Sequence, residues 1–353
     1  MIKPIKILYI YPGTKSTFVD KDLRLLAEKF RVSEYKFNTQ NKKLLPLYFF
    51  QQAFFLVRNI FKHDLYIIMF GGYWSFLPVV LAKFFNKKSI IINGGTDCVS
   101  FPSIGYGSLQ KSPIAWFTKK SFLNASHIVT LHSSLMFQNY KYMDLEYKSQ
   151  GLQFHIPNLK TPSTTIYNGY DANFWKATQK KVPKSFITVS IGLGEARRRA
   201  VKGIDLVLEI APRFPDCQFI IVGTDPSELH DAPKNVILLT KKTPIELVPI
   251  YSEATFYLQL SMSEGFPNSL CEAMLCECVP IVSDVASMPF IVSDTGFVLK
   301  KKDIGLLKSL ISDALSSDTN ALGQKARKRI SENFTETLRQ EKLLNLVANI
   351  LKD

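Results

Sequence analysis

Short apolar runs alternate with helical stretches along this chain of 353 residues, in two successive sets. The runs fall at residues 5–10, 65–70, 88–93, 127–131, 186–192, 218–223, 235–240, 255–260, 279–283 and 296–300. Alternation of strands and helices predicts parallel, doubly wound sheets, so two sets predict an α/β fold with two Rossmann-like domains. Ligands bind beyond the carboxyl ends of the strands in such sheets, so residues that follow strands are the candidates for a site.

A polar stretch at residues 177–184 has the composition of a linker and separates the two sets. We therefore expect an N-terminal domain over residues 1–175 and a C-terminal domain over residues 185–333. Residues 335–351 show the pattern of a long amphipathic helix.

Positive charge is concentrated in the first half of the chain. Residues 1–172 carry 21 Lys and Arg against 9 Asp and Glu, a net charge of +12, whereas residues 173–353 carry 23 against 21, a net charge of +2. A basic excess suits nucleic acid, an anionic membrane or an anionic substrate, and no nucleic-acid-binding motif accompanies it here. Residues 44–62 predict a strongly apolar helix flanked by Lys and Arg. This composition fits a helix in a membrane interface and, equally, a core-packed helix with solvated ends.

Several features indicate a reducing, cytoplasmic environment. The N-terminal residues run directly into a strand pattern, so no signal peptide is expected. The five cysteines show no disulfide pattern, and the cluster of Cys271, Cys276 and Cys278 has no histidine nearby, which favours buried thiols over zinc.

The uncharged stretch 65–82 contains two glycines and a proline, so we expect a strand, a turn and a helix start rather than a membrane span.

Two carboxylates, Glu264 and Glu272, bracket a Gly-Phe-Pro turn that opens an apolar helix. Pro267 suits the first helical position, and Gly265 allows the backbone to approach a ligand closely. The N–H groups of the next residues, Asn268, Ser269 and Leu270, would point out of the helix N-terminus, where the helix dipole favours a phosphate. A carboxylate also accepts two hydrogen bonds side by side, which suits the vicinal hydroxyls of a sugar or ribose.

This stretch resembles the E-x7-E signature of retaining GT-B glycosyltransferases of family 4, the group 1 glycosyltransferases. The resemblance covers nearly the whole chain and is strongest over residues 186–300. It implies that Glu272 holds the donor ribose and that Glu264 binds donor-sugar hydroxyls. Gly265 and Phe266 would complete the donor side with the helix N-terminus. It further implies that the C-terminal segment 334–353 crosses back to the first domain.

A second element follows the strand predicted at 186–192. The turn Gly192-Leu193-Gly194 precedes three arginines and Lys202-Gly203, a combination of close backbone and fixed cations that suits a diphosphate. A dinucleotide fingerprint would need glycine at position 197, where an arginine stands. The segment resembles the Arg and Lys-Gly element of family 4. Lys202 matches that element directly, and Arg198 is our choice among Arg197, Arg198 and Arg199.

The first half offers candidates for the acceptor side. The loop Asn93-Gly94-Gly95-Thr96-Asp97 resembles a Gly-Gly-x-Asp stretch of a subgroup, so Asp97 is a candidate for orienting the acceptor hydroxyl or taking its proton; a loop-capping role is the equal alternative. Gly13 resembles the glycine of the first-domain loop, with a plain strand-to-helix turn as its alternative. Asn168-Gly169-Tyr170-Asp171 resembles a structural segment that closes the first domain.

Two departures from the family pattern lie on the donor side. Relatives often carry a glycine after the E-x7-E helix, where this chain has Glu277-Cys278-Val279, and often read Gly-Gly-x-Pro-Glu, where it has Ala286-Ser287-Met288-Pro289-Phe290. Because of these two departures, the sequence does not identify the base or the sugar of the donor. Asp20-Lys21-Asp22 spells the D-x-D metal motif of the GT-A fold, but it lies in a helical pattern. Helix N-termini favour Asp, so no metal site is expected there. The resemblance implies catalysis without an essential metal or other cofactor.

Taken with this resemblance, the sequence predicts a GT-B glycosyltransferase that moves a hexose-type sugar from a UDP- or GDP-sugar to an acceptor hydroxyl. The resemblance implies retention at the anomeric carbon. The acceptor would be a glycan or a lipid-linked glycan in the synthesis of cell-surface polysaccharide, lipopolysaccharide or glycolipid. The basic N-terminal domain predicts peripheral docking on an anionic membrane, and no nucleic-acid partner is expected. The alternatives are a sugar-nucleotide epimerase of the same fold, and a non-catalytic basic protein that binds membrane or nucleic acid.

Overall fold

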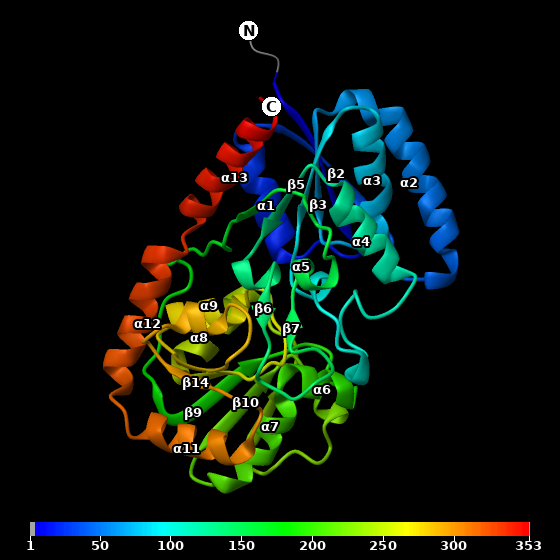
Figure 1. The fold of residues 1–353 in the computed structure, drawn as a ribbon. Helices are drawn as coiled ribbons and strands as arrows, with labels where there is room; N and C mark the ends of the chain where they lie inside the picture. Colours follow the sequence, from blue (N-terminus) through cyan, green and yellow to red (C-terminus); the bar gives the residue numbers. More distant parts are fainter. Residues whose placement is uncertain (1–3, 353) are drawn as a thin grey trace. The chain divides into compact units, whose positions relative to one another are not determined.

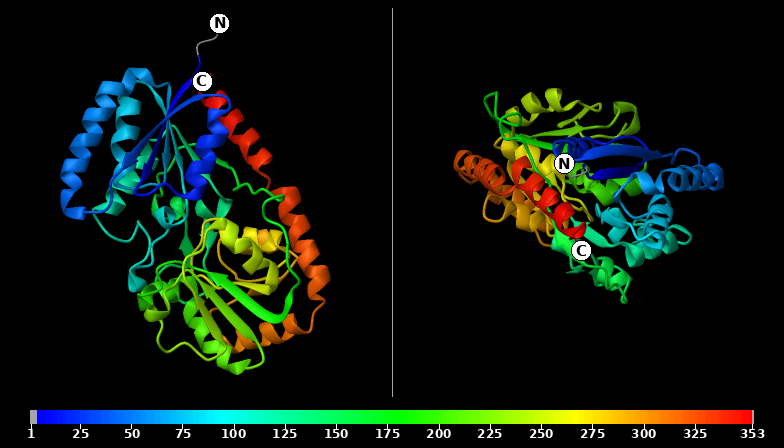
Figure 2. Two further views of the ribbon diagram at one scale, coloured as in Figure 1. Left: turned by 180° about the vertical axis from the view of Figure 1, so that it is seen from behind. Right: turned by 90° about the horizontal axis from the view of Figure 1, so that it is seen from above.

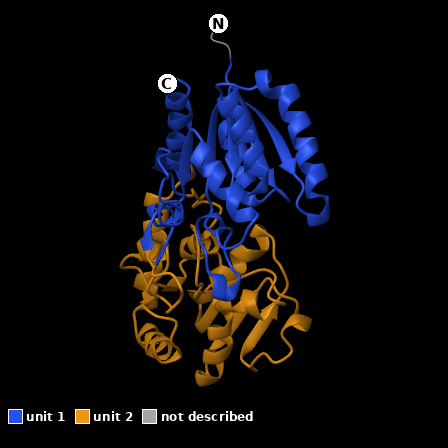
Figure 3. Ribbon diagram, turned by 45° about the vertical axis from the view of Figure 1, so that its right-hand side comes forward, with its two compact units in different colours: residues 1–138, 149–167, 337–353 blue, residues 139–148, 168–336 orange. Residues whose placement is uncertain are grey.

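The computed structural model describes residues 4–352 and divides into two compact units, coloured separately in Figure 3. Unit 1 comprises residues 1–138, 149–167 and 337–353, and unit 2 comprises residues 139–148 and 168–336. Unit 2 therefore includes two segments from the predicted N-terminal domain. Hydrogen bonds anchor them there, since the Tyr140 hydroxyl donates to the carbonyl of Met262 and the Asn168 amide donates to the side chain of Asn268.

Unit 1 is built on a six-stranded parallel sheet with the strand order β2-β1-β3-β4-β5-β8 (Figure 1). The strands are β1 (Lys6–Pro12), β2 (Arg31–Phe37), β3 (Leu65–Met69), β4 (Lys88–Ile92), β5 (His127–Thr130) and β8 (Ser163–Thr165). Helices α1 (Thr17–Ala27) and α13 (Glu336–Ile350) cover one face, and α2 (Leu45–Asn59), α3 (Tyr73–Phe84) and α4 (Ile114–Asn124) cover the other (Figures 1 and 2). Because both faces are covered, β3 is apolar and buried at every position.

Unit 2 repeats this plan with a second six-stranded parallel sheet, ordered β11-β10-β9-β12-β13-β14. Its strands are β9 (Val182–Val189), β10 (Gln218–Val222), β11 (Val236–Leu239), β12 (Ala254–Gln259), β13 (Val279–Ser283) and β14 (Phe297–Leu299). Its helices are α6 (Ala196–Lys202), α7 (Ile204–Ile210), α8 (Pro244–Glu253), α9 (Asn268–Leu275), α10 (Met288–Val292), α11 (Ile304–Leu315) and α12 (Thr319–Asn333). The core of this unit includes a stack of Phe186, Phe219 and Phe256 from three adjacent strands.

The predicted α/β class with two Rossmann-like parallel sheets is confirmed, and each of the ten apolar runs contains a strand. Besides the two-residue strands β6 (Gln138–Asn139) and β7 (Ser149–Gln150), two strands of the unit 1 sheet, β2 and β8, were not predicted. Both lie at edges of the unit 1 sheet, and β2 buries only its last residue, so neither carries the continuous apolar pattern of a central strand.

The uncharged stretch 65–82 forms β3, a turn and most of α3, as expected. Within residues 4–352, a different stretch, Lys42–Lys62, is the one helical segment long and apolar enough to cross a membrane by length and composition. It comprises α2 and the short 3-10 turns at its two ends, Lys42–Leu44 and Ile60–Lys62.

Candidate functional site

The loops that follow β9 and β12 lie at the carboxyl edge of the unit 2 sheet. These two strands are neighbours, and the chain leaves β9 toward β10 on its other side. Strand order therefore reverses between β9 and β12, and this switch point is the usual place for a ligand in an open α/β sheet. Most of the predicted donor-side residues belong to these two loops or to the helices that follow them.

Lys202 and Glu264, predicted from separate motifs, are in direct contact. Lys202 ends α6, and its Nζ donates to Oε1 of Glu264 at 2.6 Å, with the two side chains 30% and 12% exposed. Gly203 allows the end of α6 to lie close to the end of β12. Its φ is +70°, and an added Cβ would lie 2.1 Å from the carbonyl oxygen of Leu260. The structure thus brings a cation and a carboxylate together at the end of β12.

Gln259, the last residue of β12, is a site residue that the sequence analysis missed. Its Nε2 donates to Oε1 of Glu264 at 3.1 Å and to Oγ of Ser261 at 2.9 Å, and its Oε1 accepts from the Tyr257 hydroxyl at 2.9 Å. Burial raises the pKa of Tyr257, which keeps that hydroxyl protonated and able to donate. The signal in the sequence was a lone amide at the end of an otherwise apolar strand.

Two of the three consecutive arginines are engaged locally. Nη1 of Arg199 donates to the carbonyls of Leu193 at 2.7 Å and Gly194 at 3.1 Å, so Arg199 stabilises the glycine turn. Nη2 of Arg197 lies 3.4 Å from Oε2 of Glu195 in an exposed ion pair. These contacts leave Arg198 as the remaining candidate.

Arg198 lies directly against the glycine turn. Gly192 has a φ of +74°, and a Cβ added to it would lie 3.2 Å from Cζ of Arg198. No hydrogen bond or ion pair to another residue of the described range 4–352 is found for the Arg198 guanidinium. Among the three arginines, the geometry therefore favours Arg198 as the one that can meet an anionic ligand.

Helix α9 begins one residue later than expected. Pro267 occupies the N-cap, with φ −69° and ψ 115°, rather than the first helical position. A proline cap has no side chain that can accept a hydrogen bond, so the N–H groups of Asn268, Ser269 and Leu270 receive no side-chain cap. The Ser287 hydroxyl donates to the Gly265 carbonyl at 2.7 Å and anchors the turn before the helix.

The side chain of Phe266 packs inside unit 2. It is 5% exposed, and its ring lies 5.3 Å from that of Phe334 in an edge-to-face contact. The ring of Phe266 therefore has a packing role. Of the predicted donor-side position, only the backbone of Phe266 lies in the turn. The turn is held by this aromatic contact as well as by the bond from Ser287.

The Asn-Gly-Tyr-Asp segment supports the start of α9. Nδ2 of Asn168 donates to the Phe266 carbonyl at 3.3 Å and to Oδ1 of Asn268 at 3.0 Å, and the Tyr170 hydroxyl donates to the same Oδ1 at 2.8 Å. Asp171 accepts from the N–H of Asn173 at 2.8 Å, so its predicted capping role is confirmed. The side chain of Asn268 is thereby fixed, which leaves its backbone N–H for a ligand.

Glu272 lies in the second turn of α9 and is partly exposed. Its negative charge helps to raise the pKa of the buried Tyr170, after the larger effect of burial itself. Glu264 and Glu272 come from different elements, the loop after β12 and the helix α9, as predicted for two carboxylates that hold different parts of one ligand.

Asp97 and Gly13 belong to unit 1, whereas the donor-side candidates belong to unit 2. Asp97 is 2% exposed, and its carboxylate accepts from the backbone N–H groups of Gly71 at 2.8 Å, Gly94 at 3.0 Å and Gly95 at 3.0 Å. It thus ties together the loops that follow β3 and β4. Burial raises its pKa against the opposing effect of these hydrogen bonds. The geometry favours the loop-capping alternative over a role as base.

Gly13 turns the chain after β1 with a φ of +63°, and its N–H donates to the carbonyl of Phe37 at 2.9 Å. Asn93, between β4 and the loop of Asp97, is fully buried. Neither polar atom of its amide has a hydrogen-bond partner within the described residues.

Asp22 of the D-x-D motif has a structural partner. Its two carboxylate oxygens accept from Nε and Nη2 of Arg339, each at 2.8 Å, and both side chains are buried. No group of three or more His, Cys, Asp or Glu side chains that could hold a metal ion is found in residues 4–352. All five cysteines are buried, and none forms a disulfide within residues 4–352.

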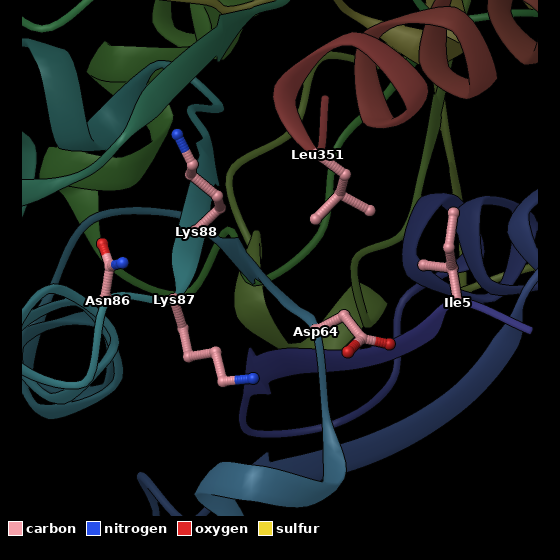
Figure 4. A pocket seen from close by; sticks show the side chains of 6 residues that line it. All are labelled: Ile5, Asp64, Asn86, Lys87, Lys88 and Leu351. Carbon is pink, nitrogen blue, oxygen red and sulfur yellow. The ribbon is translucent and has the colours of Figure 1, made fainter. Parts of the chain in front are cut away.

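A hollow of about 390 Å³ lies at the amino edge of the unit 1 sheet, where strands β1, β3 and β4 begin (Figure 4). It is lined by Ile5, Asp64, Asn86, Lys87, Lys88 and Leu351. Asp64, its one carboxylate, accepts from the N–H of Lys6 at 2.9 Å. This hollow contains none of the predicted site residues.

Comparison with known families identifies the second half of the chain. Residues 172–337 match the family model described as glycosyl transferases group 1. The matched segment contains the Lys202 and Glu264 pair, Gln259, Arg198 and all of α9, so the group 1 domain carries every donor-side candidate.

Curated relatives match over part of their length. Trehalose synthase of Thermococcus litoralis is 26% identical over 165 residues, which are 41% of this chain and 39% of that protein. O-antigen chain mannosyltransferase B of Escherichia coli is 33% identical over 109 residues, 29% of each chain. Alpha-galactosylglucosyldiacylglycerol synthase of Streptococcus pneumoniae is 29% identical over 109 residues, 28% of this chain and 29% of that protein. The chain thus spans about two fifths or less of these relatives.

Solved structures match over nearly the whole chain. Sucrose-phosphate synthase from Thermosynechococcus elongatus has a TM-score of 0.75 at 14% identity, covering 99% of both chains. Anabaena HepE in complex with UDP and glucose has a TM-score of 0.70 at 13% identity, covering 98% of this chain and 100% of that one. At these identities the likeness establishes the fold, which is that of the GT-B glycosyltransferases.

Proposed function

We propose that the protein transfers a hexose-type sugar from a UDP- or GDP-sugar to an acceptor hydroxyl, with retention at the anomeric carbon. The observation that carries the proposal is the position of Arg198, Lys202 and the N-terminus of α9 after the neighbouring strands β9 and β12, at one switch point. Fixed cations and free N–H groups at one sheet edge suit a diphosphate. Group 1 membership and the UDP complexes of the structurally similar HepE support this proposal.

Each residue has a role in this proposal. Glu272 binds the ribose diol, and Glu264, oriented by Gln259, binds hydroxyls of the donor sugar. Lys202 and Arg198 neutralise the diphosphate while its bond to the anomeric carbon breaks and the bond to the acceptor oxygen forms. Stabilisation of the leaving group and alignment of the acceptor then supply most of the rate enhancement. Because these two side chains supply fixed positive charge, we propose that no metal ion or other cofactor is essential.

The acceptor is proposed to be a glycan or a lipid-linked glycan. The similarity to an O-antigen mannosyltransferase and to a glycolipid synthase supports a place in cell-surface polysaccharide, lipopolysaccharide or glycolipid synthesis. The site of action would be the cytoplasm, at the inner face of the cell membrane.

A thermal-shift screen of UDP- and GDP-sugars tests the donor. A true donor at about 100 times its Kd is expected to stabilise the protein by about 2.7 kcal/mol. Glu272→Ala is expected to abolish most of this shift, whereas Glu332→Ala on the exposed side of α12 is expected to retain it. Absence of a shift with every UDP- and GDP-sugar at millimolar concentration would contradict the proposal. Turnover in EDTA, assayed with the donor so identified, tests the independence from metal.

A further inference from the structure

Helix α2 is apolar on two faces, and the fold uses one of them. The buried face consists of residues four apart, namely Tyr48, Gln52, Leu56 and Ile60. A second row, at spacings of three and four, is exposed: Leu47 (47%), Phe50 (70%), Phe54 (53%), Val57 (57%) and Phe61 (77%). Such a row forms one continuous stripe along a helix. Large apolar side chains at such exposures, gathered on one stripe, indicate an interaction surface.

This exposed stripe continues onto the end of α3. The ring of Phe61 lies 5.6 Å from that of Phe85, which in turn lies 5.0 Å from Phe84. Phe84 is 79% exposed. In Figures 1 and 2, α2 and α3 run side by side on one face of the unit 1 sheet. We call the stripe on α2 together with Phe84 the aromatic face.

The charged side chains of the helical stretch that carries most of the aromatic face are all positive. The stretch Lys42–Lys62 contains Lys42, Lys43, Arg58 and Lys62 and no Asp or Glu. The guanidinium of Arg58 lies 4.3 Å from the centre of the Phe54 ring, so charge and apolar surface are adjacent. No ion pair with an acidic side chain of residues 4–352 is found for these four cations.

The surrounding sequence extends this charge. Residues 35–138 contain 11 Lys and Arg against two aspartates, Asp64 and Asp97, a net charge of +9. Asp97 is buried and bound to three backbone N–H groups, which leaves it no part in the surface charge. This charge is therefore complementary to an anionic surface.

The buried face of α2 is held to the rest of unit 1 by specific contacts. Nε2 of Gln52 donates to the Trp74 carbonyl at 2.9 Å, and the Tyr66 hydroxyl donates to the Ile60 carbonyl at 3.1 Å. The ring of Tyr48 also packs against Phe37. A spanning orientation would break these contacts, whereas a flat one uses only the face that is already exposed.

We propose that the aromatic face docks unit 1 on a membrane containing anionic lipids, with Phe50, Phe54 and Phe61 entering the headgroup region and Arg58 and Lys62 contacting lipid phosphates. Apolar side chains on one face and basic side chains beside them are the composition of helices that lie in the interface plane. The inference specifies the surface behind the proposed membrane location and does not depend on sugar transfer, because binding to a bilayer requires no donor.

Co-sedimentation with vesicles tests the proposal. The wild-type protein is expected to bind vesicles of phosphatidylcholine with phosphatidylglycerol, and to bind vesicles of phosphatidylcholine alone at least roughly tenfold more weakly. Phe50→Ser/Phe61→Ser is expected to weaken binding by roughly tenfold or more, because two exposed rings are lost. Arg58→Gln/Lys62→Gln is expected to weaken binding mainly at low salt.

The matched control is Ile245→Ser/Leu306→Ser, which removes two exposed apolar side chains (76% and 48%) from unit 2. It is expected to bind vesicles like the wild type, and an unchanged melting temperature of each variant shows that it is folded. Binding of the Phe50→Ser/Phe61→Ser variant at wild-type strength would overturn the proposal. So would failure of the wild type to bind anionic vesicles, or a dimer in solution that this variant dissociates, since the face would then bind a second copy. Donor-induced stabilisation, measured on the same samples, reports separately on the proposed function.

Discussion

At the scale of single residues, the main finding is a set of buried polar side chains that orient the candidate site. Gln259 contacts Glu264 on one side and Tyr257 on the other, and it is only 4% exposed. A buried amide bound on both sides restricts the orientations available to its partners. Gln259 is therefore a positioning residue for Glu264, while Glu264 is the residue expected to meet the donor.

Gln259→Leu removes the amide and leaves Glu264 with Lys202 alone. We expect the folded state to lose about 1–3 kcal/mol, because the Tyr257 hydroxyl also loses its acceptor. Gln259→Leu should also lose more of the donor-induced thermal shift than Tyr257→Phe does, since Glu264 is no longer oriented. Tyr257→Phe is the control, because it removes the distal bond without touching Glu264. Equal donor-induced shifts in the two variants would show that Gln259 has only a structural role.

His155 predicts a dependence of stability on pH. Burial, with a smaller effect from Lys119, lowers its pKa to about 4, against an ordinary value near 6.5. Between these values the unfolded chain binds a proton that the folded chain does not, so the free energy of unfolding falls as the pH is lowered from about 6.5 to about 4. Burial also lowers the pKa of His63, His127 and His132, which adds to the same trend.

Urea unfolding of the wild type and of His155→Gln at several pH values between about 7 and about 4.5 checks this prediction. The variant should show a shallower loss of stability over this range, because the glutamine side chain does not titrate. Parallel curves for the two proteins would mean that His155 does not contribute.

At the scale of elements, two connections on the donor side adopt glycine-like conformations without glycine. Glu277, between α9 and β13, has a φ of +64°, and Ala286, between β13 and α10, has a φ of +51°. These are the two places where relatives of the group 1 pattern often carry glycine and this chain does not. The backbone path there resembles what a glycine would adopt, although the side chains differ. A residue with a side chain pays a conformational energy when its backbone adopts the left-handed region, so these two connections are strained.

Glu277→Gly is therefore expected to stabilise the protein by about 1 kcal/mol, because it relieves the left-handed strain. Glu332→Gly, in an exposed helical stretch of α12, should destabilise it by about 1 kcal/mol and is the matched control. Urea midpoints at constant slope measure both changes. A loss of stability in Glu277→Gly would show that contacts of the Glu277 side chain outweigh the strain.

Strands were predicted from the sequence where their residues form an apolar run and were missed where they do not. β3 and β4 are apolar because helices cover both faces of the sheet, and both were found. β2 is an edge strand with a largely polar sequence, and only its pairing with β1 makes it a strand. The start of α9 was placed one residue early, because proline suits both the N-cap and the position after it.

At the scale of the whole chain, residues far apart in sequence complete unit 1. Helix α13 is held by Arg339, which pairs with Asp22 of α1 across 317 positions of sequence and also donates to the carbonyls of Ile166 and Tyr167. The Tyr9 hydroxyl contacts the same carboxylate at 3.2 Å. This buried cluster ties the end of the chain to its first helix and first strand.

Arg339→Met leaves the Asp22 carboxylate buried without its cation, and we expect a loss of about 3–5 kcal/mol in the free energy of unfolding. Asp22→Asn/Arg339→Met should regain part of this loss, because a neutral amide is cheaper to bury than a charge. Chemical denaturation of the wild type and both variants measures the difference. A double variant that is less stable than the single one would contradict this explanation.

The sequence by itself determined the α/β class, the positions of the central strands and the candidate residues Glu264, Glu272 and Lys202, because burial and turn chemistry leave local patterns. The tertiary structure decided which of these residues meet. It paired Lys202 with Glu264, placed Gln259 beside them, distinguished Arg198 from its neighbours and showed that one apolar face of α2 is exposed. The reason is that contacts between distant residues depend on strand order and on which helix face meets the sheet, and neither is written in a local pattern.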